Sequence, residues 1–211
     1  MTHQKTNDFN EILKGRRSIK EYDTSVKISK EEMTEILETA TKAPSSVNMQ
    51  PWRFVIVESD AAKEKLKPLV RTNQTQLETS AAMIAVFGDL KNFDNFEAIY
   101  GRAVELGYMP AEIKDYVATN YGNYFETIPR DAMKDVVLID GGLVSMQIML
   151  AARAHGYDTN PIGGFEKDQI NAALGLDEDR YVPVMLLSIG KAVKEGRASY
   201  RLPVAEITEW Q

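Results

Sequence analysis

The sequence of 211 residues contains no cysteine and only two histidines, His3 and His155. Without cysteine the protein forms no disulfide, thiolate nucleophile, iron–sulfur cluster or thiolate zinc site. Two histidines are too few for a histidine-rich metal site, and a Ser-His-Asp triad would depend on His155 alone. We expect His155, directly before Gly156, to lie at a helix end rather than to act in catalysis. If the protein is an enzyme, these absences favour a bound organic cofactor as the reactive group, with no metal and no catalytic side chain.

A strong charge of one sign and a long apolar run are also missing. The chain has 25 Lys and Arg against 31 Asp and Glu, a net charge of −6, with both signs spread along it. An acidic protein of this kind repels nucleic-acid phosphates and anionic lipids, so we expect neither nucleic acid nor a membrane as a partner. The first ten residues lack the apolar core of a signal peptide, and the most apolar stretch, residues 182–189, falls short of the ~20 residues of a membrane helix. These features predict a cytoplasmic protein.

No internal repeat, low-complexity tract or linker interrupts the chain, which predicts one domain spanning residues 1–211. Apolar residues at helical spacing, together with capping and stop signals, predict helices at residues 7–14, 29–43, 136–154 and 166–174. Short apolar runs predict buried strands at residues 53–57, 82–87, 159–162 and 181–190. The helix at residues 136–154 is apolar on nearly every face, so we expect it to be the central buried helix.

Two segments differ from this core pattern. Residues 92–126 are polar and aromatic, and they predict a pair of helices, broken at Pro110, that projects from the core. Their aromatic side chains have two possible roles: they form one wall of a substrate site, or they pack between the helices. The tail from Lys191 onward has little core signal, and such a tail usually needs another surface to lie on.

A cluster of basic residues follows the first predicted helix. Residues 15–20, Gly-Arg-Arg-Ser-Ile-Lys, carry two guanidinium groups, a hydroxyl and an ammonium group. Such a cluster is the size of a phosphate group and has the donors that phosphate prefers. The alternative is that basic residues after a helix simply complement its C-terminal dipole.

A stiff polar loop lies between the second helix and the first strand. Residues 43–52 hold two serines, two carboxamides and two prolines, so they form neither a helix nor a strand. A surface loop rich in turn-forming residues is one interpretation. The two prolines and Trp52 favour another, in which a stiff loop makes hydrogen bonds to a polyol or a heterocycle.

Consecutive glycines end the third predicted strand, in the sequence Asn160-Pro161-Ile162-Gly163-Gly164-Phe165. Glycines here allow the backbone to approach a planar group closely and leave N–H groups free to donate. An ordinary Gly-Gly turn is the alternative.

Together, these three segments, the Asn-Gln-Thr-Gln stretch at residues 73–76 and the closing Tyr200-Arg201-Leu202-Pro203 resemble the FMN-dependent nitroreductase family over essentially the whole chain. Within that family the chain is similar to bacterial NAD(P)H nitroreductases of about this length. The resemblance implies an α+β sandwich with a central, mostly antiparallel sheet flanked by helices. It also implies an intertwined homodimer with two FMN molecules at the subunit interface, and NADH or NADPH as electron donor.

The resemblance also implies roles for individual residues. The FMN phosphate and ribityl chain would be held by Arg16, Arg17, Ser18 and Arg201. Lys20 would lie near flavin N1 and the C2 carbonyl, where a cation stabilises the anionic reduced flavin. The flavin of the partner subunit would be reached by the loop of Pro44, Ser45, Ser46, Asn48 and Gln50. One flavin face would be covered, with an N–H toward N5, by Pro161, Ile162, Gly163 and Gly164. Gln74 would face the pyrimidine edge or the ribityl chain.

Two positions depart from the family pattern. No lysine lies in residues 74–77, where some members place one beside the flavin, and Ser199 and Tyr200 precede Arg201 where some relatives carry another basic residue. Neutralisation of the phosphate would then depend more on Arg16, Arg17 and Arg197.

The resemblance implies an FMN-dependent NAD(P)H oxidoreductase that reduces flat electrophiles such as nitroaromatics or quinones by ping-pong hydride transfer. A reductase of the same fold acting on enones or halogenated aromatics is one alternative. A flavin-binding redox sensor with slow turnover is another.

Overall fold

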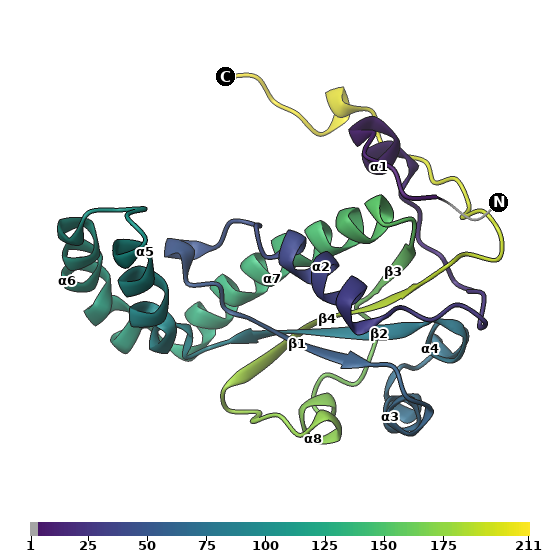
Figure 1. The fold of residues 1–211 in the computed structure, drawn as a ribbon, viewed down its shortest axis with the longest axis horizontal. Coiled ribbons are helices and arrows are strands. Elements are labelled where there is room, and N and C mark those ends of the chain that lie inside the picture. The colour runs from purple at the N-terminus through teal and green to yellow at the C-terminus, as the bar shows by residue number, and fades with distance from the viewer. Residues whose placement is uncertain (1–3) are drawn as a thin grey trace.

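The computed structural model describes residues 4–211, so His3 lies outside the described residues. Its centre is a four-stranded antiparallel sheet in the order β1-β2-β4-β3 (Figure 1). The strands are β1 (Trp52–Val57), β2 (Ala82–Asp89), β3 (Asp158–Ile162) and β4 (Tyr181–Gly190). All four predicted strands are confirmed, with ends within two residues of those expected. The antiparallel sheet of the predicted α+β fold is confirmed with them.

Helices cover both faces of this sheet. The helices are α1 (Phe9–Gly15), α2 (Lys30–Ala40), α3 (Asp60–Leu66), α4 (Gln74–Thr79), α5 (Arg102–Glu105), α6 (Ala111–Thr127), α7 (Arg130–Ala154) and α8 (Ile170–Leu174). Along β2, Ile84 and Val86 face the core with α2 and α7, whereas Met83 and Phe87 face the core with α3 and α8 (Figure 1). This alternation follows from the two-residue period of a strand. Because both faces are covered, every residue of β2 is buried.

Several helix ends differ from the sequence prediction. Ser29 caps α2 by accepting a hydrogen bond from the Glu32 backbone N–H, as the pattern predicts. The Glu32 carboxylate, however, accepts a hydrogen bond from the Tyr157 hydroxyl at 2.7 Å, so the capping box is only half formed. The helix predicted at residues 166–174 is regular only at Ile170–Leu174. Helix α7 begins six residues earlier than expected, directly after Pro129, whose fixed φ suits a helix start.

Helix α7 is central, as predicted, but its face away from the sheet is open. Ile139, Leu143 and Met146 are 66%, 43% and 37% exposed, and their spacing of four and three residues puts them in one stripe. The expectation of a buried helix is therefore confirmed for the face toward the sheet and wrong for this outer stripe in the single chain. Within residues 4–211, α7 is also the one helix long and apolar enough to span a membrane by length and composition. Half of its most apolar window is buried in the fold.

The segment of residues 92–126 is helical and projects from the sheet, as predicted (Figure 1). A π-helical turn, Glu97–Gly101, leads into α5, and Pro110 is the N-cap of α6. Rings of Phe93, Phe96, Tyr100 and Phe125 stack on one another, with neighbouring centroids 4.8 or 4.9 Å apart. For these four residues, packing between the helices accounts for the aromatic character.

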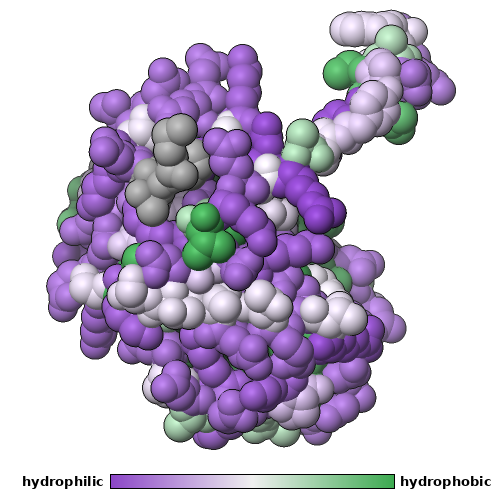
Figure 2. All heavy atoms as spheres, turned by 90° about the vertical axis from the view of Figure 1, so that its right-hand side faces the viewer, coloured by the Kyte–Doolittle hydropathy of each residue, from purple (hydrophilic) through white to green (hydrophobic). Residues whose placement is uncertain are grey.

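The C-terminal tail leaves the fold after β4. Every residue from 197 to 211 is exposed, and Tyr200 and Trp210 are exposed by 79% and 93%. Figure 2 shows the tail as an arm that stands clear of the body. The expected lack of a core in this tail is confirmed.

A buried ion pair joins the end of α7 to the start of β3. Arg153 Nη1 lies 2.6 Å from Asp158 Oδ1, and both side chains are nearly inaccessible. The chain reverses between them at Gly156, which has φ of +77° and follows the C-cap residue His155. The predicted helix stop at Gly156 and the place of His155 at the helix end are thus confirmed.

We predict that Arg153→Met lowers the free energy of unfolding by about 3–5 kcal/mol, because it leaves the buried Asp158 carboxylate without its cation. Urea unfolding would measure the change. Arg102→Met is the matched control, since Arg102 pairs with Glu105 on the exposed surface at 2.8 Å. It should cost less than about 1 kcal/mol. Equal losses in the two variants would contradict the role of the buried pair.

Candidate functional site

A cleft lies between the segment after α1, the start of α4 and the C-terminal tail. Its volume is about 720 Å³. It is lined by residues 16–21, Thr72, Asn73, Thr75, Gln76, residues 194–199 and Arg201. Residues 16–20 are fixed against the sheet, because Ser18 forms a β-bridge with Thr159 and the Ile19 N–H donates to the Thr159 carbonyl at 3.1 Å.

Gly196 allows the tail to cross this segment closely. A Cβ at residue 196 would lie 2.4 Å from the Cβ of Arg17, too close for any side chain. Only a glycine therefore lets the tail form the outer wall of the cleft. Gly196 was not among the residues predicted from the sequence, although an isolated glycine in a charged tail is a signal of close backbone approach.

Positive charge dominates the cleft. Its lining includes Arg16, Arg17, Lys20, Lys194, Arg197 and Arg201, against Glu21 and Glu195. Lys194 pairs with Glu21 at 2.7 Å. In the described part of the chain no ion pair joins the other five cations to a carboxylate. Arg17 and Arg201 donate instead to main-chain carbonyls.

The pKa of Arg16 shows the effect of the neighbouring positive charges. Burial lowers the pKa of Arg16, and the positive charges of Arg201 and Arg17 lower it further. Three guanidinium groups thus lie close together in the cleft, and their like charges repel one another. A phosphate would accept their hydrogen bonds and neutralise their charge. The donor set therefore fits a phosphate-bearing ligand.

The structure brings together five of the predicted site residues. Arg16, Arg17, Ser18 and Lys20 line the same cleft as Arg201, although about 180 residues of chain separate the two groups. Arg197 lies there as well. The loop of Pro44, Ser45, Ser46, Asn48 and Gln50 does not line this cleft within one chain, nor does the turn from Pro161 to Gly164.

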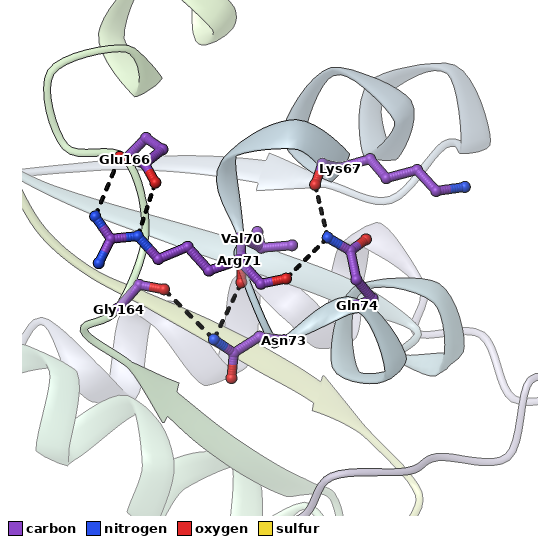
Figure 3. A network of polar contacts seen from close by, with 7 residues as sticks. All are labelled: Lys67, Val70, Arg71, Asn73, Gln74, Gly164 and Glu166. Atoms are coloured by element: carbon purple, nitrogen blue, oxygen red, sulfur yellow. Dashed lines mark hydrogen bonds and ion pairs between the residues drawn. The ribbon is translucent and has the colours of Figure 1, made fainter.

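Gln74 also turns away from the cleft. Its side-chain amide donates to the main-chain carbonyls of Lys67 at 2.8 Å and Arg71 at 3.1 Å (Figure 3). Arg71 itself has a left-handed backbone, with φ of 50°. The neighbours Asn73, Thr75 and Gln76 line the cleft instead. The expectation that Gln74 faces the ligand does not agree with this side-chain direction.

The glycine turn is tied to the wall of the cleft. Asn73 Nδ2 donates to the Gly164 carbonyl at 3.4 Å, and Arg71 forms two hydrogen bonds with Glu166, at 2.7 and 3.1 Å (Figure 3). Gly163 and Gly164 do not have positive φ, which an ordinary Gly-Gly turn uses. A Cβ at either position would meet no atom within 4 Å. The chain's own packing thus does not require these glycines, and open space lies beside them.

The polar loop adopts a strained conformation. Val47, Asn48 and Gln50 have φ of 49°, 52° and 48°, in the left-handed region that non-glycine residues rarely occupy. Each such residue costs roughly 1–3 kcal/mol and persists only where surrounding contacts hold it. Strain of this kind is concentrated at functional sites.

Asp140 of α7 holds this loop. Its carboxylate accepts hydrogen bonds from the backbone N–H and the hydroxyl of Ser46, at 3.0 and 3.1 Å. Burial raises the pKa of Asp140, and the two hydrogen bonds from Ser46 oppose that shift. The sequence analysis missed Asp140, although a single carboxylate in the middle of an apolar helix was a visible signal.

His155 lies away from the cleft. Its Nδ1 is 3.4 Å from the Glu32 carboxylate, which also contacts Lys5 and Tyr157. Among the described residues no group of three His, Asp or Glu side chains could hold a metal ion. The arrangement of the cleft can bind an anion and position a ligand.

Comparison with known proteins gives consistent matches. The model described as "Nitroreductase family" matches residues 13–191. The chain is 64% identical over 207 residues to "Putative NAD(P)H nitroreductase YdgI" of Bacillus subtilis (strain 168), covering 98% of this chain and 99% of that protein. It is 35% identical over 190 residues to the "CLA biosynthesis enone reductase" of Lactiplantibacillus plantarum, covering 90% and 88%. A crystal structure of a "putative nitroreductase in complex with FMN" from Exiguobacterium sibiricum 255-15 has a TM-score of 0.96 and 62% identity over 100% of both chains.

Proposed function

The chain belongs to the nitroreductase family, and on this premise we propose that it is an FMN-dependent NAD(P)H oxidoreductase. Its acceptors are flat electrophiles such as nitroaromatics or quinones. One observation carries the proposal: the cleft holds five cations without carboxylate partners among the described residues, and its wall is tied to a glycine turn beside open space. The FMN complex of a relative 62% identical to this chain supports the choice of flavin.

The proposed roles of the residues follow from their positions. Arg16, Arg17, Ser18 and Arg201 bind the phosphate and ribityl chain from one side of the cleft. Lys20 provides a cation for the pyrimidine end of the ring, and the Gly163–Gly164 backbone approaches the ring face. FMN, when bound, supplies the hydride chemistry that no side chain here offers. The chain itself binds and orients the ligand.

We propose an intertwined homodimer as the functional unit. The Ser45–Gln50 loop lies outside its own chain's cleft, which suits a loop that reaches the site of a partner subunit. The exposed stripe of Ile139, Leu143 and Met146 on α7 and the apolar side chains of the exposed tail offer surface for the contact. We further propose that residues 1–211 act as one domain in the cytoplasm, where NAD(P)H is available.

A second acceptor class has support of its own. A relative 35% identical to this chain is named an enone reductase. We therefore propose enones as the alternative to nitroaromatics and quinones, and steady-state assays with all three classes would rank them. Turnover that stays slow with every acceptor would favour the flavin-binding redox sensor instead.

Purified protein should be yellow and release FMN rather than FAD, because the cleft suits one terminal phosphate. Arg16→Ala and Arg201→Ala should each weaken FMN binding by roughly 1.5–3 kcal/mol, the range for charge-assisted hydrogen bonds. Fluorescence titration of the apoprotein would measure this, with Arg53→Ala on the exposed side of β1 as the control. Extracted FAD, or unchanged affinity in both variants, would refute the proposed phosphate site.

Removal of residues 197–211 should destroy the dimer and FMN binding together, because the tail forms one wall of the cleft and has no core of its own. Sedimentation velocity would report the oligomeric state, and flavin absorbance would report the cofactor. A truncated monomer that still binds FMN tightly would contradict a site built from two subunits.

Steady-state kinetics should show parallel double-reciprocal lines, because donor and acceptor use one site in turn. His155→Ala should keep most of the activity, since His155 contacts Glu32 and does not line the cleft. Gly163→Val should reduce activity without loss of stability, because the added side chain enters open space beside the turn. Intersecting lines would indicate a ternary complex. A hundredfold lower kcat in His155→Ala with normal FMN binding would identify a missed general acid.

A further inference from the structure

Asp140 has no role in the chemistry proposed above, yet its position is unusual. It is the one buried carboxylate of α7, among neighbours such as Val137, Gly141 and Val144. A buried carboxylate is unfavourable unless both oxygens receive hydrogen bonds. Both are supplied by Ser46, 94 residues away in sequence, and not by the turn of α7 next to Asp140.

The packing of α7 fixes Asp140 in space. At the next residue, Gly141, a Cβ would lie 2.7 Å from the side chain of Val184 on β4. The helix therefore lies unusually close to the sheet at this point, and interiors packed this tightly deform little. Asp140 consequently presents its carboxylate to Ser46 from a rigid base.

A second anchor comes from the projecting helices. Tyr100 is buried, and its hydroxyl donates to the Val47 carbonyl at 2.9 Å. It lies in the π-helical turn Glu97–Gly101, and its ring stacks on Phe96 with centroids 4.8 Å apart. Single π-helical turns are frequent at functional sites. Met49 packs in the same cluster and is 1% exposed.

These anchors decide which loop groups point outward. Ser46 is held by Asp140, Val47 by Tyr100, and Met49 by the aromatic cluster. Between these held residues, Asn48 is exposed. The Gln50 carboxamide lies within 3.5 Å of the Asn48 side chain. The exposed Asn48 side chain and the half-buried Gln50 carboxamide thus lie together on the loop.

We propose that Asp140 is a positioning residue, with Tyr100 as the second anchor, that holds the Ser45–Gln50 loop in its left-handed conformation. In that conformation the loop offers Asn48 and Gln50 as hydrogen-bonding partners to the flavin in the cleft of a second subunit. The inference rests on the proposed FMN function. It adds that affinity for FMN depends on a carboxylate that need not touch the flavin.

The test compares Asp140→Ala and Asp140→Asn with the matched control Asp135→Ala, which changes an exposed carboxylate of the same helix. Hydrogen exchange of the apoprotein reads the loop directly, and fluorescence titration with FMN reads the site. Asp140→Ala should speed exchange at residues 46–50 and weaken FMN binding about tenfold to a hundredfold, the loss expected for hydrogen bonds to a charged group. Hydrogen exchange in β4 should stay at the wild-type rate. The control Asp135→Ala should match the wild type in both loop exchange and FMN affinity.

Asp140→Asn should restore loop protection and bring FMN affinity within about threefold of the wild type, because the amide oxygen accepts from the Ser46 N–H and the amide NH₂ donates to the Ser46 hydroxyl. Tyr100→Phe removes one hydroxyl and nothing else. It should weaken FMN binding by about threefold to tenfold, the loss expected for one neutral hydrogen bond. Tyr116→Phe, an exposed tyrosine of α6, is its control. If Asp140→Ala does not fold, Asp140→Asn still tests the role of Asp140, and Tyr100→Phe tests whether a loop anchor affects FMN affinity.

Three outcomes would overturn the inference. Faster loop exchange in Asp140→Ala with unchanged FMN affinity would show that the loop does not serve the flavin. An Asp140→Asn variant as impaired as Asp140→Ala would show that the negative charge, not the hydrogen bonds, matters. Tyr100→Phe with the FMN affinity of Tyr116→Phe would remove the second anchor. Failure of the proposed function itself appears separately, as wild-type protein that binds no FMN while its loop remains protected.

Discussion

The close contact between α7 and the sheet is the constraint on which the rest of the structure depends. A Cβ at Gly88 of β2 would lie 2.6 Å from Val137, and a Cβ at Gly141 of α7 would lie 2.7 Å from Val184. Two glycines, one on each side of the contact, bring the helix and the sheet together more closely than side chains would permit. The position of α7 then sets where Asp140 meets the loop, where Arg153 meets Asp158, and which stripe of the helix faces outward.

The cleft and the loop illustrate two ways in which this protein departs from maximal stability. In the cleft, Arg16 lies near Arg17 and Arg201, so like charges are held close together. In the loop, Val47 and Asn48 adopt a backbone that non-glycine residues avoid. Neither arrangement stabilises the isolated chain, and the proposed ligand and second subunit would offset both. The unfavourable features of the fold thus mark the regions where binding is proposed.

The elements of the fold could be predicted from the sequence, whereas several side-chain contacts near the candidate site could not. All four strands and the central helix could be found because their apolar periodicity reflects burial, and Ser29 and Gly156 marked helix ends through local backbone chemistry. The direction of a side chain is not a local property. The amide of Gln74 turns toward the main-chain carbonyls of Lys67 and Arg71, and Asp140 finds its partner in Ser46 across the fold. Such contacts depend on tertiary packing, which periodicity does not describe.

The crowded guanidinium groups of the cleft have a consequence for the life of the protein in a cell. A ligand that binds only the folded chain shifts the folding equilibrium by mass action, by an amount set by its concentration relative to its dissociation constant. Here a phosphate-bearing ligand would also relieve the repulsion among Arg16, Arg17 and Arg201. The folded fraction, and with it the resistance of newly made chains to proteolysis, would therefore rise and fall with the supply of that ligand.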